Sequence, residues 1–127
     1  MKKALIVIKP ELSKKGLMNK AIETIKSKGL VILCQKNETF SRYAPKGAEK
    51  FHGFEKRYLT GGESILLATS ADDAVKLAKQ VSSEIQNILG VSDNEMQYFL
   101  HVPDNNEVAK YEIMRFFTEK ELKDKTN

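Results

Sequence analysis

Residues 4–8 of this chain read Ala-Leu-Ile-Val-Ile, an unbroken apolar run that is followed directly by Lys9 and Pro10. Its length and its β-branched residues predict a buried β-strand, and the strand ends at Pro10 because proline has no N–H group to donate. The run is much shorter than a membrane span and too short for the core of a secretion signal. We therefore expect a cytoplasmic protein with no membrane segment.

Strand signals recur three more times along the chain. Strands are predicted over residues 30–34, with a continuation toward Phe40, over residues 64–69 after a Thr-Gly-Gly turn, and over residues 96–102. Apolar residues at helical spacing and capping signals fill the gaps. We predict a helix over residues 17–25 before Gly29, one or two short helices within residues 42–59, and a helix capped by Ser70 and Asp73. A short helix over residues 85–89 before Gly90 and a last helix capped by Asp104 or Asn105 are also predicted.

The order of these elements is β-α-β-β-α-β with a trailing helix. This order is typical of the α/β (α+β) class with the ferredoxin-like plan, a four-stranded antiparallel sheet with helices packed on one face. At 127 residues, the chain has the length of one domain with one buried core. We therefore predict a single domain over residues 1–127.

The net charge of +4 comes from lysines that are spread along the chain, with acidic residues between many of them. Such a surplus suits an anionic ligand such as a polyphosphate, and it equally suits weak contact with nucleic acid or a plain solvated surface. The single cysteine, Cys34, excludes an intrachain disulfide and a zinc site built from cysteines.

The chain has two histidines, and His101 is the one at the end of a predicted strand. An imidazole there can serve as a nucleophile, a general base or a metal ligand, or it can be structural. Lys9 emerges at the end of the first strand, and the sequence leaves open whether it reaches His101. The chain has neither a P-loop nor a dinucleotide fingerprint, so side chains and helix N-termini would have to hold a nucleotide. His52 is expected at the surface.

Several motifs, in chain order, resemble those of nucleoside diphosphate kinases. Residues 8–11 read Ile-Lys-Pro-Glu where the family usually has Ile-Lys-Pro-Asp, and residues 14–17 and 28–30 are similar to its Arg-Gly-Leu and Lys-Gly-Leu motifs. Residues 51–62 are similar to its Phe-x-x-Leu and Ser-Gly-Pro segment. Residues 101–117 resemble the His-Gly-Ser-Asp-Ser stretch and the helix that follows it. The resemblance covers most of the chain.

This resemblance implies a two-step transfer of the γ-phosphate from a nucleoside triphosphate to a nucleoside diphosphate through a phosphohistidine. It places the nucleophile at His101, a lysine that neutralises phosphate charge at Lys9, and a glutamate that holds the histidine ring at Glu112. It also implies phosphate contact by Tyr43, base stacking by Phe51 and Mg²⁺ bridging the phosphates. Phe51 suits a core position equally well, and no specific nucleic acid partner is expected.

The chain also departs from the family pattern. Tyr98 stands where the family has an asparagine, and Val102 and Pro103 replace the Gly-Ser pair, which removes a hydroxyl beside the nucleophile. Lys79 replaces an arginine and offers a point charge in place of a bidentate fork. Between residues 81 and 96 the chain is shorter than the family's loop, and the Thr and Arg phosphate ligands of that loop have no counterpart. Tyr98 and Lys79 remain the candidate nucleotide contacts.

Two functions are compatible with these features. The first is a compact, divergent nucleoside diphosphate kinase, and the second is a catalytically weak or inactive nucleotide-binding or regulatory module of the same fold. Retention of His101, Lys9 and Glu112 together favours the enzyme. The family forms tetramers or hexamers from a shared dimer, so a homo-oligomer, at least a dimer, is expected.

Overall fold

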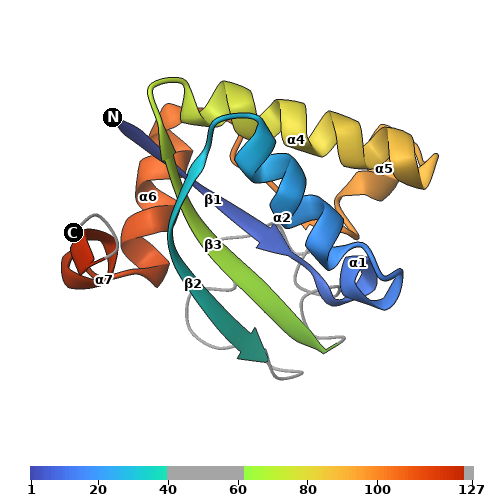
Figure 1. Cartoon of the computed structure of the whole chain (residues 1–127), viewed down its shortest axis with the longest axis horizontal. Helices are drawn as coiled ribbons and strands as arrows, with labels where there is room; N and C mark the ends of the chain where they lie inside the picture. The colour runs from blue at the N-terminus through green and yellow to red at the C-terminus, as the bar shows by residue number, and fades with distance from the viewer. Residues whose placement is uncertain (40–61, 125–127) are drawn as a thin grey trace.

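The computed structural model describes residues 1–39 and 62–124. At its centre lies a four-stranded antiparallel sheet in which the strands follow the order β2-β3-β1-β4. Figure 1 shows β2, β3 and β1 side by side. The strands are β1 (Lys2–Ile8), β2 (Val31–Thr39), β3 (Glu63–Ala71) and β4 (Leu100–His101). This order confirms the ferredoxin-like plan that was predicted from the succession of strands and helices.

Helices connect and flank these strands. They are α1 (Pro10–Lys14), α2 (Met18–Ser27), α4 (Ala74–Leu89), α5 (Asp93–Met96), α6 (Asn106–Phe116) and α7 (Glu119–Asp124). Pro10 is the first residue of α1, where a missing N–H group costs nothing and the ring favours helical backbone angles. Within the described ranges, none of these helices is long and apolar enough to cross a membrane.

Strand β1 is buried on both faces of the sheet. Ala4, Ile6 and Ile8 belong to one hydrophobic cluster, whereas Leu5 and Val7 belong to another. All five side chains are fully inaccessible to solvent. Successive side chains of a strand point to opposite faces, so a run without polar alternation fits only a strand that is covered on both sides.

Helices therefore cover both faces of the sheet, and the expectation that they all pack on one face is wrong. Helices α2 and α4 lie over the face of Ala4, Ile6 and Ile8, whereas α6 lies on the opposite side (Figure 1). Helix α6 contributes Ile113 to the cluster around Leu5 and Val7, and Phe117 follows it there. Without α6, the second apolar face of β1 would be exposed to water.

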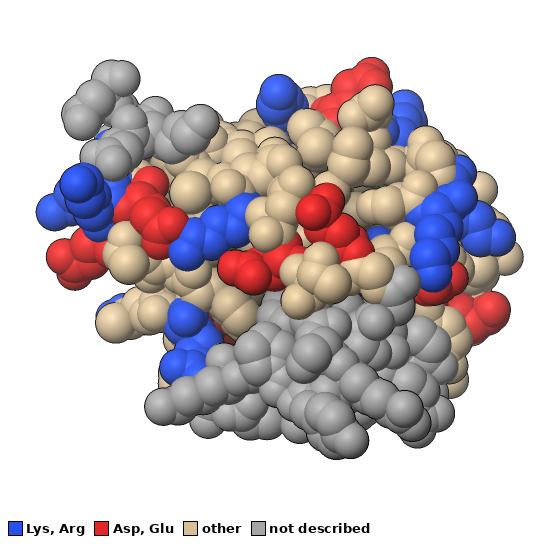
Figure 2. Space-filling model, turned by 90° about the horizontal axis from the view of Figure 1, so that it is seen from below, with Lys and Arg blue, Asp and Glu red and all other residues tan. Residues whose placement is uncertain are grey.

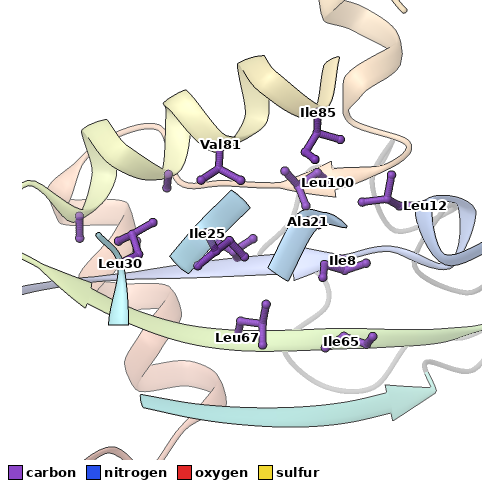
Figure 3. Packing of buried hydrophobic residues seen from close by; sticks show 14 of the residues in the cluster. Ile8, Leu12, Ala21, Ile25, Leu30, Ile65, Leu67, Val81, Ile85 and Leu100 are labelled. Atoms are coloured by element: carbon purple, nitrogen blue, oxygen red, sulfur yellow. The ribbon is translucent and has the colours of Figure 1, made fainter. Parts of the chain in front are cut away.

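The larger core lies between the sheet and helices α2 and α4. Ala21 and Ile25 of α2 and Val81 and Ile85 of α4 meet the strand side chains there, among them Ile8 of β1 (Figure 3). These helical positions recur at intervals of three or four residues, so each helix turns one apolar stripe toward the sheet.

The predicted capping box at Ser70 is wrong. Ser70 lies within β3, opposite Lys3 of β1 and Val31 of β2, and α4 begins only after Asp73. Pairing with a strand on each side extends β3 to Ala71, and this tertiary pairing overrides the local preference of the Ser-x-x-acid pattern for a helix start.

Two further expectations are corrected between α4 and α6. Helix α4 is continuous to Leu89 and absorbs the separate short helix predicted there, and it ends as expected at Gly90, whose φ of 69° is left-handed. The fourth strand comprises only Leu100–His101, because its predicted first residue, Met96, ends helix α5. Ser92 and Glu95 form a capping box that starts α5.

Candidate active site

The antiparallel pairing of β1 and β4 brings the first strand end to His101. Val7 lies directly opposite His101, and the backbone N–H of Lys9 donates to the carbonyl oxygen of Phe99 at 3.1 Å. Lys9 is thus a diagonal neighbour of His101 across the strand pair, and such neighbours lie roughly 7–8 Å apart. The structure answers the question that the sequence left open, because the two residues meet at the same end of the sheet.

Glu112 reaches the same place from the other side. It lies on α6, the helix that covers the Val7 face of the sheet, and its Oε2 atom is 2.8 Å from Nε2 of His101. The pairing is an ion pair when the imidazole is protonated, and it places Nε2 beside the carboxylate. The other ring nitrogen, Nδ1, is then the one that faces away from Glu112.

All three ionisable side chains are buried: Lys9 is 0% exposed, Glu112 4% and His101 7%. Burying a charge is costly unless a partner and hydrogen bonds compensate for the lost water. Ionisable groups buried together in this way are more common at functional sites than in ordinary cores. The cluster is therefore the strongest candidate for chemistry within the part of the chain that the structure describes.

Lys9 is held by the backbone of the segment that leads into β4. Its Nζ atom donates to the carbonyl oxygen of Gln97, which is the C-terminal cap residue of α5. The ammonium group is thereby kept close to the chain that carries His101. Sequence reasoning missed Gln97, and no sequence signal identifies it, because the contact uses a backbone atom that every residue has.

One carboxylate oxygen of Glu112 is left without a donor. Among the described residues, Oε1 of Glu112 is buried and has no hydrogen-bond partner. A buried acceptor of this kind costs about 1–3 kcal/mol. The resemblance to the family puts a serine hydroxyl at the position of Pro103, which is buried here and has no hydroxyl to offer.

Arg115 is a second residue that sequence reasoning missed. It follows Glu112 by three residues on α6, so the two side chains project from neighbouring positions of the helix. Its Nε atom is buried and has no hydrogen-bond partner in the described ranges. Its place between Ile113 and Phe116, both of which were expected to face the core, is the sequence signal that could have identified it.

The remaining predicted contacts fall in different places. Tyr98 is half-buried and lies between Gln97 and Phe99, the two residues whose carbonyls contact Lys9. Lys79 is exposed on α4 and lines a cavity of about 720 Å³ that contains none of the three cluster residues, so the structure does not bring it to His101. Tyr43 and Phe51, like His52, lie outside the described residues.

The surface around these elements carries charges of both signs. Figure 2 shows lysine and arginine side chains interspersed with aspartate and glutamate over the described part of one face. This distribution agrees with the sequence, in which acidic residues lie between the lysines.

Comparison with known proteins gives a consistent result. The family model of nucleoside diphosphate kinases matches residues 2–122. The chain is 26% identical over 136 residues to the nucleoside diphosphate kinase of Campylobacter fetus subsp. fetus, covering 96% of this chain and 99% of that protein. It is 28% identical over 133 residues to the one from Phenylobacterium zucineum, covering 91% of this chain and 94% of that protein.

Solved structures agree with the fold. The apo nucleoside diphosphate kinase of Encephalitozoon cuniculi matches with a TM-score of 0.78 at 20% identity, over 94% of this chain and 91% of that one. The Aquifex aeolicus nucleoside diphosphate kinase matches with a TM-score of 0.72 at 20% identity, over 95% of this chain and 98% of that one. With a family model that spans nearly the whole sequence, this chain belongs to the nucleoside diphosphate kinase family.

Proposed function

We propose that this protein transfers the γ-phosphate of a nucleoside triphosphate to a nucleoside diphosphate through a phosphohistidine at His101. The observation that carries the proposal is the buried pairing of His101 with Glu112 at 2.8 Å, beside the buried ammonium group of Lys9. Homologues that match more than nine-tenths of the chain are named for this activity. The alternative of an inactive module is not favoured, because the three residues are retained together.

In the first proposed step, the lone pair of His101 Nδ1 attacks the γ-phosphorus. Contact with Glu112 occupies the Nε2 side and holds the ring, which leaves Nδ1 as the nucleophile. The bond between the γ-phosphorus and the bridging oxygen breaks, and the nucleoside diphosphate leaves with that oxygen. Lys9 offsets the charge on the transferred group, where positioning and electrostatics supply most of the catalysis.

The second proposed step reverses the first with another nucleotide. A terminal oxygen of the acceptor diphosphate attacks the phosphorus, the P–N bond breaks, and His101 recovers its lone pair. Glu112 again holds the imidazole, so the same geometry serves both directions. Because Lys79 faces a different cavity, we leave it out of this step and retain Tyr98 as the nearer proposed nucleotide contact.

Mg²⁺ is proposed to arrive with the triphosphate, as part of the substrate. Within residues 1–39 and 62–124, no three His, Cys, Asp or Glu side chains gather in a way that suits a metal ion. Magnesium prefers oxygen ligands and is commonly held through phosphates with few protein ligands. A site that binds the metal mainly through the nucleotide is compatible with these residues.

A homo-oligomer and a cytoplasmic location complete the proposal. Strand β2 is an edge strand of nine residues, and Val31 at its start is 52% exposed. An exposed edge presents unpaired N–H and C=O groups to a second chain. Light scattering on a sizing column would distinguish a dimer or larger assembly from a monomer.

The proposed reaction is tested by mixing the protein with ATP, Mg²⁺ and a different nucleoside diphosphate. Chromatography of the nucleotides should show the new triphosphate and ADP in equal amounts, and initial rates should follow a ping-pong pattern. His101→Ala should remove the conversion, whereas His52→Ala, which changes the only other histidine, should retain it. Equal conversion by the wild type and His101→Ala would reject the proposed route.

A further inference from the structure

A second cavity lies on the other flank of α6, away from His101. It has a volume of about 730 Å³ and lies between the start of β1, helix α6 and helix α7. Glu112 points to the histidine, whereas the next residue, Ile113, lines this cavity. None of His101, Lys9 and Glu112 lines it, so it is separate from the proposed active site.

The interior of the cavity is apolar. Ile113 and Phe117 are 3% and 4% exposed and form part of the core, and Leu122 of α7 packs against the same cluster. Met1 and Met114 also line the cavity, yet they are 77% and 70% exposed. Methionine side chains are flexible and adapt to varied apolar ligands. An apolar ligand would remove these two side chains from water.

Three lysines stand around this apolar interior: Lys2, Lys3 and Lys110. Among the described residues, none of the three ammonium groups makes an ion pair or a hydrogen bond. Glu119 is the one acidic residue in the lining, which leaves an excess of two positive charges. Lysines can extend their alkyl stems over apolar surface while the charge meets an anionic head group.

We propose that this cavity binds a single-chain amphiphilic anion, with the alkyl chain against Ile113 and Phe117 and the carboxylate head near the lysines. The volume falls in the range of about 300–1,000 Å³ that is typical of small-molecule sites. The combination of an apolar interior and unpaired cations selects against neutral polar ligands and against cations. The ligand class follows from this complementarity and does not depend on the phosphotransfer reaction.

The methionines provide a direct test. The chain has four, of which Met1 and Met114 line the cavity, whereas Met18 and Met96 belong to the core on the opposite face of the sheet. In protein labelled with ¹³C at the methionine methyl groups, decanoate should shift the signals of Met1 and Met114 in a saturable way. The signals of Met18 and Met96 should stay in place.

Charge selectivity is tested with matched ligands and variants. Decyltrimethylammonium, which has the same chain with a cationic head, should bind at least about fivefold more weakly than decanoate. The double variant Lys3→Glu/Lys110→Glu should weaken decanoate binding by about fivefold or more. Lys20→Glu/Lys76→Glu, which makes the same charge change at exposed positions outside this cavity, should leave decanoate binding unchanged.

Several results would overturn the proposal. They are the absence of a saturable shift at Met1 and Met114, equal shifts at all four methionines, equal binding of the anionic and cationic probes, and equal effects of the two double variants. A shift of Met1 and Met114 with protein concentration alone would show that a second copy of the chain occupies the cavity, which also contradicts it.

Discussion

The Nε2 atom of His101 lies 2.8 Å from the Oε2 atom of Glu112, although the two residues come from β4 and α6. Both side chains are almost completely buried. The contact depends on α6 lying across the Val7 face of the sheet, the same placement that covers the second apolar face of β1. The packing that stabilises the fold therefore also orients the candidate nucleophile.

Replacing Glu112 by glutamine should slow phosphorylation of His101 without unfolding the protein. The amide retains the size of the carboxylate. It no longer stabilises a single orientation of the His101 imidazole or a proton on its Nε2 atom. At metal sites, mutating a carboxylate that orients a ligand histidine typically lowers metal affinity or activity by roughly 10–100-fold. We expect a loss of that order in the rate of His101 phosphorylation. Single-turnover labelling with ATP measures the rate, and Glu107→Gln on the exposed side of α6 is the matched control. Equal rates for Glu112→Gln and the control would contradict this role.

Lys9→Met should abolish most of the transfer activity while the protein still folds. Methionine keeps much of the apolar stem that is buried at this position but removes the charge that we propose offsets the phosphates. Loss of one electrostatic contact of this kind costs about 10²–10³-fold in kcat. Lys14→Met changes an exposed lysine of α1 whose one ion pair among the described residues is with Glu11, at 3.1 Å, and should keep full activity. If both variants show similar kcat values and similar circular dichroism, Lys9 has no catalytic part.

Pro103→Ser should increase the rate of phosphohistidine formation. Oε1 of Glu112 is buried without a hydrogen-bond donor among the described residues, and the family resemblance puts a serine hydroxyl at position 103. A hydroxyl that reaches the carboxylate would hold Glu112, and through it His101, in one orientation. We expect a gain of a few fold, about the value of one hydrogen bond. Val102→Ser, one residue earlier, is the control; no gain for Pro103→Ser over that control would reject the explanation.

Helix α7 should lose part of its anchoring in acid. Glu121 accepts one hydrogen bond from the backbone N–H of Thr118 at 2.8 Å and pairs with Lys36 of β2 at 2.9 Å. The bond from Thr118 first, and then Lys36, lower the pKa of Glu121 below its ordinary value of 4.5. Because the folded-state pKa is the lower one, the ionised carboxylate stabilises the fold above pH 4.5, and this stabilisation is lost as the pH falls through the lowered pKa.

Glu121→Gln should therefore lower Tm at pH 7, and its Tm should approach that of the wild type in acid. Glu119→Gln is the matched control, since Glu119 makes no ion pair or hydrogen bond within the described part of the chain. Melting curves of the three proteins between pH 3 and pH 7, roughly the interval in which carboxylates titrate, measure the effect. A difference between Glu121→Gln and the wild type that is the same at every pH would contradict the titration.

Local pattern was enough to predict most strands and helices but not how they meet. The run of residues 4–8 predicted a buried strand, and its lack of alternation already indicated burial on two faces, which the expected one-sided packing overlooked. The predicted helix cap at Ser70 was wrong because pairing with β1 and β2 extends β3. This tertiary pairing cannot be seen in the residues around Ser70. The capping box of Ser92 and Glu95 was visible in the sequence and was missed, which made the fourth strand too long.

The candidate site shows the same contrast between what local pattern predicts and what tertiary arrangement decides. His101, Lys9 and Glu112 could be named from motifs, but their convergence depends on strand register and on the side of the sheet that α6 occupies. Lys79 has the expected place on its helix, yet that helix turns it toward a different cavity. The roles of Tyr43 and Phe51 stay predictions.

The most direct test of the central claim is intact-mass analysis of the protein after brief incubation with ATP and Mg²⁺. The wild type and His52→Ala should each gain one phosphoryl group that mild acid removes, as expected for a phosphohistidine, whereas His101→Ala should gain none. Absence of the acid-labile group from the wild type, or its persistence in His101→Ala, would contradict the assignment of His101 as the phosphorylated residue.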